Sequence, residues 1–569
     1  MNMLLRKHFY IMVKNSLRKI KVATVPVVNW NRRYTLLLSA LCLILYFMVG
    51  CGNYLKDGQT TSLSQHDRAM IDSIIASKFH SHPVPGLAVG LVVGDQIYTK
   101  TVGYSDAINF IDFNESTVFC TGVISETFTA SLALALKHHF KVDLNEPISK
   151  YLPHFSLNSS TYKNITINHL LTQTSGVPRH GVFWDFPNMG DSALWHTTWS
   201  IRLQEPEFET PGTKVVRSPY NFDIAADLIA HASNSRFEDF VTKYLFTPLQ
   251  MKMSTYDADK IFSSNYARPH QISSWLTNQF ETTSDYPING EHAGSIGWHT
   301  NIEEATRWIS MLLNGGKYNE KQILPAKLVH QMMTPTLKTD QVGSFVGLGW
   351  EIKTINGTQV FIKAGAVGAF ENALVMIPEF KMGVMVVVNA QTDFMPDIFA
   401  QELLFSIKNK NVPQYRPSIH YEMGRILNST QSIDAALEFF TETAQNSPGL
   451  YDCSDLALSQ LGANLFYRMG RENEALRVYE TCLHLFPNSV YSYLNYAEYY
   501  LYKNDVEKTE RELARVNQLA NNEPDVVSRI GLIKGALELI KEKMEEETDA
   551  TNNLASEGEI CIPCEDETK

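Results

Sequence analysis

Cysteine is scarce in this chain. The 569 residues contain seven cysteines, and two of them, Cys561 and Cys564, form a C-x-x-C arrangement close to the C-terminus. A chain of this length with so few cysteines is not a disulfide-dense scaffold. The C-x-x-C pair has no second pair to complete a zinc site, so it favours an ordinary tail segment over a metal or redox centre.

A net positive charge is also missing. The formal net charge is −12, whereas nucleic-acid binding needs a basic surface. The acidic excess is largest in residues 541–569, which carry ten acidic and three basic residues. This composition predicts a solvated tail. We therefore expect no nucleic-acid partner, and we interpret residues 536–569 as a disordered acidic tail.

Several catalytic signatures are absent. The chain has no G-x-S-x-G elbow and no H-E-x-x-H zinc motif, and no Ser–His–Asp set can be assigned from spacing. His169, His292 and His299 match no metal-ligand pattern and are interpreted as surface or core histidines. The sequence thus predicts neither a metal nor a cofactor.

The N-terminal segment has the composition of an export signal. Residues 1–34 contain eight Lys or Arg and no acid, and the apolar run 35–50 follows. The run ends in M-V-G-C, which resembles a bacterial lipoprotein box in which Cys51 would be lipidated. The alternative is an uncleaved membrane anchor over residues 36–55. Both interpretations predict an exported, membrane-anchored protein, periplasmic or at the cell surface.

The remaining chain divides by its patterns. After the segment 1–50, a polar tether covers residues 51–64, and a mixed region covers residues 65–411. Apolar spacing in the mixed region predicts helices at 67–79 and 123–139 and β-strands at 87–93, 97–103, 359–364, 373–377 and 383–389. We expect the N-terminal hairpin and the late strands to share one antiparallel sheet.

Strand signals stop after residue 411. The set Ala436, Phe440 and Pro448 recurs with Ala475 as its first residue, and a weaker copy begins near Tyr493. Small residues, aromatics and Pro at matched positions resemble tetratricopeptide repeats. We interpret residues 412–535 as repeats that bind a protein partner; the alternative is an ordinary helical bundle.

The segment 119–130, FCTGVISETFTA, resembles the active-site helix F-R-x-G-S-x-S-K-x-F-T-A of serine β-lactamases and penicillin-binding proteins. Other landmarks of that family follow in order at Pro85–Val89, Leu144–Pro153, Thr166–Gly176, Pro211–Thr213 and Gly347–Trp350. Residues 65–411 are identified as a member of the β-lactamase-related serine hydrolase family. The resemblance implies an α+β sandwich, with an antiparallel sheet and an all-helical region, ahead of the α-helical repeat domain.

The family's catalytic side chains are replaced here. In the family, the first Ser of S-x-x-K is the nucleophile and the Lys is its base, but Val123 and Glu126 stand at these positions. A valine cannot form an acyl-enzyme. Ser125 lies roughly 200° around the helix from position 123, so we expect it to point away from the cleft.

The second and third motifs differ in how much they retain. The Y-x-N position falls on Arg217-Ser218-Pro219, so the Tyr and Asn are both missing. The K-T-G position falls on Lys363-Ala364-Gly365, which keeps its Lys and Gly. The resemblance therefore leaves Lys363, Gly365, Glu126 and Arg217 as candidate ligand-binding residues, with no catalytic set intact.

Three functions follow from these observations. The first is a pseudoenzyme whose cleft binds a peptide or peptidoglycan-type ligand, with Glu126 either facing that ligand or forming a structural ion pair with Lys363 or Arg217. The second is an active hydrolase of the esterase, D-aminopeptidase or carboxypeptidase type in which Glu126 activates water. The third is a repeat scaffold that carries an inert β-lactamase-like domain.

Overall fold

The structure is a computed structural model and describes residues 63–557, apart from 83, 180–187, 275–278, 340, 342, 393, 409–415 and 521–523. The export signal, Cys51, most of the tether and the Cys561–Cys564 pair lie outside the described residues. Among the helices that are described, none is both long and apolar enough to cross a membrane.

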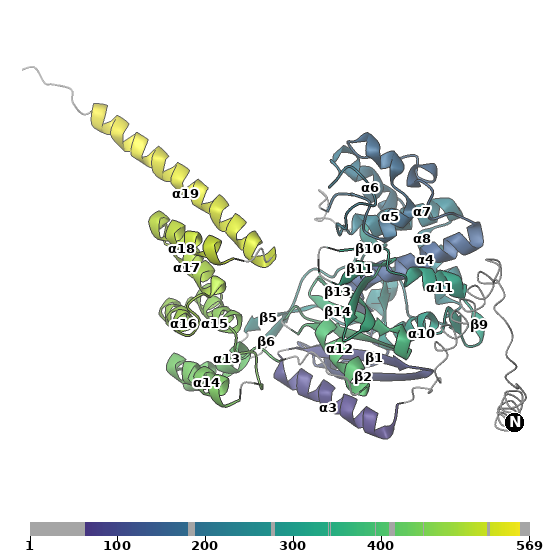
Figure 1. The fold of residues 1–569 in the computed structure, drawn as a ribbon, viewed down its shortest axis with the longest axis horizontal. Helices are drawn as coiled ribbons and strands as arrows, with labels where there is room; N and C mark the ends of the chain where they lie inside the picture. The colour runs from purple at the N-terminus through teal and green to yellow at the C-terminus, as the bar shows by residue number, and fades with distance from the viewer. Residues whose placement is uncertain are drawn as a thin grey trace, which may run out of the picture. The chain divides into compact units, whose positions relative to one another are not determined.

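A nine-stranded antiparallel sheet organises the first domain, in the order β10-β11-β12-β13-β14-β15-β1-β2-β3; several of its strands, among them β1, β2, β13 and β14, are labelled in Figure 1. Its strands are β1 (Gly86–Val93), β2 (Gln96–Asp106), β3 (Ile111–Asp112), β10 (Leu337–Lys338), β11 (Ser344–Val346), β12 (Glu351–Ile355), β13 (Thr358–Val367), β14 (Phe370–Ile377) and β15 (Met382–Val388). Strand β1 pairs with β15, Leu87 opposite Val388. The prediction of one sheet built from the hairpin and the late strands is confirmed.

Both faces of this sheet are buried. On β1, Leu87, Val89 and Leu91 belong to a core shared with α3 (Gln65–Ser81) and α12 (Pro396–Ile407). The alternate residues Ala88 and Val92 belong to a larger core that includes α10 (Ile302–Leu313). Successive side chains of a strand point to opposite faces, so a strand covered on both sides reads as the continuous apolar run seen in the sequence.

The all-helical part of the domain surrounds α4 (Ser125–Phe140), whose residues 125–136 are all buried. The Phe128 ring stacks on Trp298 with 4.3 Å between ring centroids and meets Trp308 edge-on. The other helices of the domain are α5 (Ile167–Leu171), α6 (Ala193–Ser200), α7 (Tyr220–Ser233), α8 (Phe237–Val241), α9 (Ala258–Ser263) and α11 (Ala326–Met332). Two-stranded pairs complete it: β4 (Phe119–Cys120) with β7 (His299–Thr300), β5 (His270–Ser274) with β6 (Gln279–Thr282), and β8 (Lys317–Tyr318) with β9 (Lys321–Gln322).

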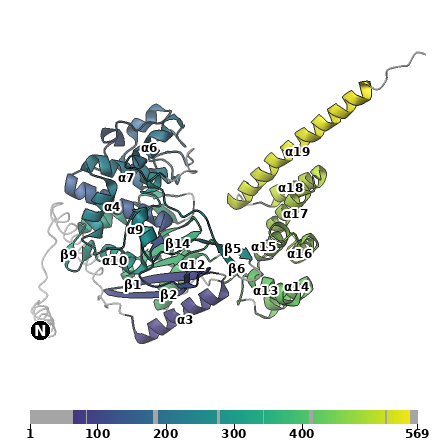
Figure 2. The same ribbon diagram turned by 180° about the vertical axis from the view of Figure 1, so that it is seen from behind.

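The C-terminal region is helical, as predicted. Its elements are α13 (His420–Thr430), α14 (Ile433–Asn446), α15 (Asp455–Tyr467), α16 (Glu472–Leu485), α17 (Val490–Tyr502), α18 (Val506–Leu519) and α19 (Pro524–Glu557), drawn in green to yellow in Figure 2. Consecutive helices pack in pairs, α13 with α14, α15 with α16 and α17 with α18. Ala436 and Phe440 on α14, like Ala475 and Tyr479 on α16, are buried between neighbouring helices.

The acidic tail differs from its prediction. Helix α19 continues to Glu557, so residues 536–557 are helical, and the residues after 557 lie outside the described part. Strong helix formers such as Glu, Lys, Leu and Ala are frequent in this segment. Lys541 pairs with Glu538 on the same helix face and with Glu510 of α18, and such neighbouring pairs support a helix.

Candidate functional site

At the N-terminus of α4, the Val123 side chain is partly exposed and the Ser125 side chain points into the core. Val123 lies in the 3-10 turn Gly122–Ile124 and is partly exposed, whereas Ser125 is buried. The Ser125 hydroxyl accepts a hydrogen bond from the Trp298 backbone N–H at 3.1 Å and lies 3.0 Å from the Thr121 hydroxyl oxygen. Ser125 therefore holds the turn against the core and faces away from the cleft, as its helical position predicts.

Strand β13 brings the third motif against this turn. A Cβ atom added to Gly365 would lie 2.8 Å from a Val123 methyl carbon. A larger residue at position 365 would therefore force Val123 or the strand to shift. The Val123 methyl groups thus lie directly against the backbone of the strand that carries Lys363 and Gly365.

Glu126 and Lys363 form a buried ion pair. Their side chains are 7% and 13% exposed. Burial raises the pKa of the Glu126 carboxyl, and Lys363 opposes that shift. Burial also lowers the pKa of the Lys363 ammonium. Each charge is therefore tolerated in this position mainly because the other is present.

Gln173 links this ion pair to the segment that replaces Y-x-N. Its amide nitrogen donates to Glu126 at 3.2 Å, and its carbonyl oxygen accepts from the Ser218 backbone N–H at 2.9 Å. The same oxygen accepts from the Asn221 side chain. Gln173 has a φ of +59°, which is uncommon for a residue other than glycine and is found at constrained sites. The sequence reasoning missed this residue; its signal was a Gln where the family landmark has His.

Arg217 is held at the rim of the same site. Its guanidinium pairs with Glu351 at the start of β12, and its side chain is 64% exposed. Burial alone would raise the pKa of Glu351, but Lys353 and Arg217 hold it below its usual value. Pro219 is the N-cap of α7, so it begins the helix and offers no polar side chain to the cleft.

These groups converge on one cleft. Its lining includes Arg217, Lys363 and Gly365, together with Gln173 and Trp350. Glu126 lies behind this lining and forms an ion pair with Lys363, and Val123 packs against Gly365. The three motif segments therefore come together, although they are distant in sequence. Their roles in binding a ligand stay predictions.

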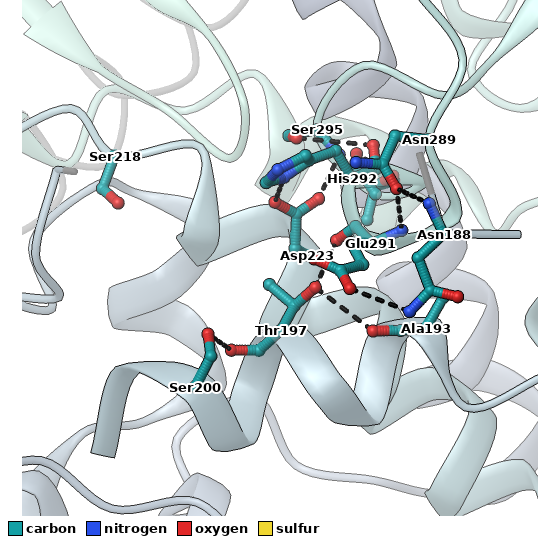
Figure 3. Close-up of polar contacts among 12 residues, drawn as sticks. Asn188, Ala193, Thr197, Ser200, Ser218, Asp223, Asn289, Glu291, His292 and Ser295 are labelled. Atoms are coloured by element: carbon teal, nitrogen blue, oxygen red, sulfur yellow. Dashed lines mark hydrogen bonds and ion pairs between the residues drawn. The ribbon is translucent and has the colours of Figure 1, made fainter. Parts of the chain in front are cut away.

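A second buried ion pair fixes the start of α7. Asp223 accepts from the Ser295 backbone N–H at 2.9 Å and lies 2.9 Å from Nδ1 of His292 (Figure 3). Burial would lower the pKa of His292, but Asp223 reverses the effect and raises it. Beside this pair, the Glu291 carboxylate accepts from the Asn188 side chain. These contacts position the helix that follows Arg217 and Pro219.

We expect Glu126→Gln to lower the free energy of unfolding by about 3 kcal/mol, because the Lys363 charge would remain buried without its partner. Lys363→Met should have a similar effect, and the double variant should recover most of the loss. Denaturation followed by tryptophan fluorescence measures this, since all eight tryptophans precede residue 351. Glu146→Gln, in an exposed pair with Lys150, is the matched control and should change the midpoint little. Strictly additive single effects would contradict a coupled pair.

The Asp223–His292 pair should make stability depend on pH. The pKa of His292 is raised above its ordinary value of 6.5, so the stabilisation is complete below that value and is lost as the pH rises through the higher folded pKa. We expect the difference in melting temperature between wild type and His292→Gln to be largest in mildly acidic buffer and to narrow at higher pH. Thermal unfolding across a pH series tests this, and a constant difference would rule it out.

Relatives of known sequence share the first domain. A family model described as Beta-lactamase matches residues 71–407. Protein flp of Staphylococcus aureus (strain MW2) is 24% identical over 340 residues, which are 59% of this chain and 66% of that protein. A protein named Beta-lactamase from Escherichia coli (strain K12) is 23% identical over 362 residues, 58% of this chain and 90% of the relative. The chain thus spans just under two thirds of the length of Protein flp.

Solved structures share its architecture. An octameric penicillin-binding protein homologue from Pyrococcus abyssi superposes with a TM-score of 0.53 at 20% identity, covering 64% of this chain and 81% of that one. A class C beta-lactamase gives a TM-score of 0.52 at 19% identity, covering 61% and 98%. At these identities the likeness concerns the fold. Because the family model spans more than half of the chain, the protein belongs to the β-lactamase family.

Proposed function

We propose that this protein is a β-lactamase-family member that does not form an acyl-enzyme and that uses its cleft to bind the end of a peptide, of the peptidoglycan-stem type. The observation that carries the proposal is the pairing of Glu126 with Lys363 beside Val123, at the positions that the family motif gives to base and nucleophile. A cleft arranged in this way retains the strand and helix positions of the family but lacks the nucleophile and the lysine base.

Replacing the nucleophile is expected to cause a large loss of catalytic turnover. Removing a nucleophile costs about 10⁶ in turnover, and about 10³ over the uncatalysed reaction remains from binding alone. The Val123 side chain offers no lone pair, and the hydroxyls of its neighbours Ser125 and Thr121 are buried against the Trp298 backbone. Lys363, which the family uses in substrate recognition, is neutralised by Glu126. Acyl transfer through this turn therefore has neither an attacking atom nor a free base.

The strand edge at the cleft supports a peptide ligand. The pairing of β13 with β12 ends at Ile362, opposite Glu351, while β13 continues to Val367 against β14. Along residues 363–366, which line the cleft, the edge facing β12 has no strand partner among the described elements. Such an edge binds an extended peptide by main-chain hydrogen bonds.

Arg217 supports recognition of a free carboxylate. Its guanidinium is exposed at the rim of the cleft and already binds one carboxylate, that of Glu351. A guanidinium has five donors and can hold a second acceptor. A peptide lying along residues 363–366 would present its C-terminal carboxylate toward this rim.

The rewired hydrolase is the second candidate, and one observation favours it. Burial raises the pKa of Glu126, which is the direction a general base needs to act near neutral pH. The ion pair with Lys363 argues against the rewired hydrolase, because the Glu126 oxygen that would take a proton already accepts a hydrogen bond from the Lys363 ammonium.

The N-terminal segment and the C-terminal helices also have proposed roles. We propose that the N-terminal segment exports the protein and anchors it to the membrane, through lipidation of Cys51 or as an uncleaved helix. The paired helices α13–α18 would then act as tetratricopeptide-like repeats and bind a protein partner. The alternate small and aromatic residues buried between α14 and α16 support repeats over an ordinary bundle.

Covalent probes test the loss of chemistry. We expect neither a fluorescent penicillin nor a fluorophosphonate to label the purified protein, because a valine stands at the nucleophile position 123, while an active class C β-lactamase in the same gel is labelled. Labelling that disappears in Ser125→Ala would overturn the pseudoenzyme proposal. Turnover of chromogenic esters that is lost in Glu126→Gln, without labelling, would establish the rewired hydrolase.

Peptide binding tests the cleft. We expect a fluorescein-labelled pentapeptide ending in D-Ala-D-Ala to bind, and Arg217→Ala to weaken it by about tenfold through loss of a charge-assisted hydrogen bond. The matched control is Arg236→Ala, since Arg236 is a comparably exposed arginine paired with Asp191 outside the cleft. The same peptide with a C-terminal amide should bind wild type as weakly as the acid binds Arg217→Ala. Equal binding of acid and amide would exclude the proposed carboxylate contact.

A further inference from the structure

Three potential metal ligands lie together away from the cleft. His154 follows the 3-10 turn Ile148–Lys150, and Asp227 and His231 lie on α7. Positions four apart on a helix share one face, so α7 presents its carboxylate and its imidazole on adjacent turns. Within the described residues, these three are the one group of His, Cys, Asp or Glu side chains whose ligand atoms all lie within 4.8 Å of one another.

The geometry of the cluster is close to that of a metal centre. Nε2 of His154 lies 2.8 Å from one Asp227 oxygen, and Nδ1 of His231 lies 3.1 Å from the other. The two imidazole ring centroids are 5.0 Å apart. Zinc binds nitrogen and oxygen ligands at about 2.0–2.1 Å, which in a tetrahedral site separates neighbouring ligand atoms by about 3.4 Å. Each of the two His–Asp separations, measured to a different oxygen of the Asp227 carboxylate, lies within about 1 Å of that spacing.

The cluster also has an open side. Asp227 is 2% exposed and anchors the group, whereas the His231 side chain is 42% exposed. Asp227 and His231 line a cavity together with Trp195 of α6, and the Trp195 ring packs beside His154 with 5.9 Å between centroids. None of the residues lining this cavity lines the cleft of Lys363 and Arg217. A fourth ligand, such as water, has room to enter from the cavity.

We propose that His154, Asp227 and His231 bind a divalent transition-metal ion of the Zn²⁺ class. Two imidazoles and one carboxylate form a ligand set suited to Zn²⁺ and poorly suited to Mg²⁺ or Ca²⁺, which prefer oxygen alone. Three protein ligands with an open position are the pattern of a zinc site that keeps an exchangeable ligand. The carboxylate offsets one of the ion's two charges.

The ligands were not visible as a sequence motif, because they come from two separate segments. His154 lies on a turn after the Lys150-Tyr151-Leu152-Pro153 landmark, and Asp227 and His231 lie far along the chain on α7. A bound ion would cross-link that turn to α7. Because α7 begins directly after Pro219, the ion would also stabilise the segment that carries Arg217.

Metal binding is tested on the full-length protein with any affinity tag removed. After dialysis against chelator, ZnCl₂ alone is titrated in a calorimeter and bound zinc is counted by mass spectrometry. We expect one equivalent per chain in wild type and a loss of at least about tenfold in affinity for His231→Gln, since even outer-sphere changes cost 10–100-fold.

His196→Gln is the matched control, because His196 pairs with the Glu291 carboxylate at 2.8 Å but belongs to no three-ligand group among the described residues. Equal zinc affinity in wild type and His231→Gln, or no zinc binding in wild type, would overturn the proposal.

A ligand exchange separates direct coordination from a structural role. With Co²⁺ as the probe, His231→Cys should retain binding and add a thiolate-to-metal absorption band that wild type lacks. Zinc should raise the melting temperature of wild type and of His196→Gln but not of His231→Gln, because an ion bound only to the folded state stabilises it. A His231→Cys protein that melts like wild type without metal, yet shows no such band with Co²⁺, would refute coordination by this position.

Discussion

The pairing of β1 with β15 is the constraint on which the site depends. It places the N-terminal hairpin inside the sheet, next to strands that come after the whole helical region. Both faces of the sheet are then covered, one by α3 and α12 and the other by α10 and the core around α4. Strand β13 pairs with β14, which pairs with β15, and its Gly365 lies against Val123 of the turn before α4. The ion pair between α4 and β13 follows from that placement.

In the turn at the start of α4, the residues that pack against the core differ from the residues at the family's catalytic positions. The packing can therefore be retained when the catalytic side chains are replaced. Ser125 holds the turn through its buried hydroxyl, and Gly122 adopts the positive φ of +54° that the turn has there; neither depends on the side chain at position 123. Glu126 replaces a cation with an anion, and Lys363 on the opposite wall becomes its partner. A charge that would be costly alone is thereby accommodated in a buried position. Gln173 extends the same network to the start of α7.

The sequence predicted the parts of the fold that have strong periodicity. The hairpin, the three late strands and helix α4 were all located, because alternating or continuous apolar runs identify elements that are buried. The short strands β11 and β12 were not predicted, since Ser344–Val346 and Glu351–Ile355 are stabilised by their neighbours and lack a long apolar pattern. Motif order located Arg217 and Lys363. It did not reveal that Arg217 pairs with Glu351, or that Gly365 touches Val123, because both are tertiary contacts.

The β1–β15 pairing has a consequence for how the chain folds. Contacts between segments so distant in sequence form slowly, because a long loop must close before they are made. Helices α13–α18 pack mainly against their sequence neighbours and need no remote segment. In a chain synthesised from its N-terminus, the edge of β1 that pairs with β15 stays without this strand partner until β15 has emerged. The first domain therefore completes its core late, just before the helical region begins to be made, and is exposed to misassembly for most of its synthesis.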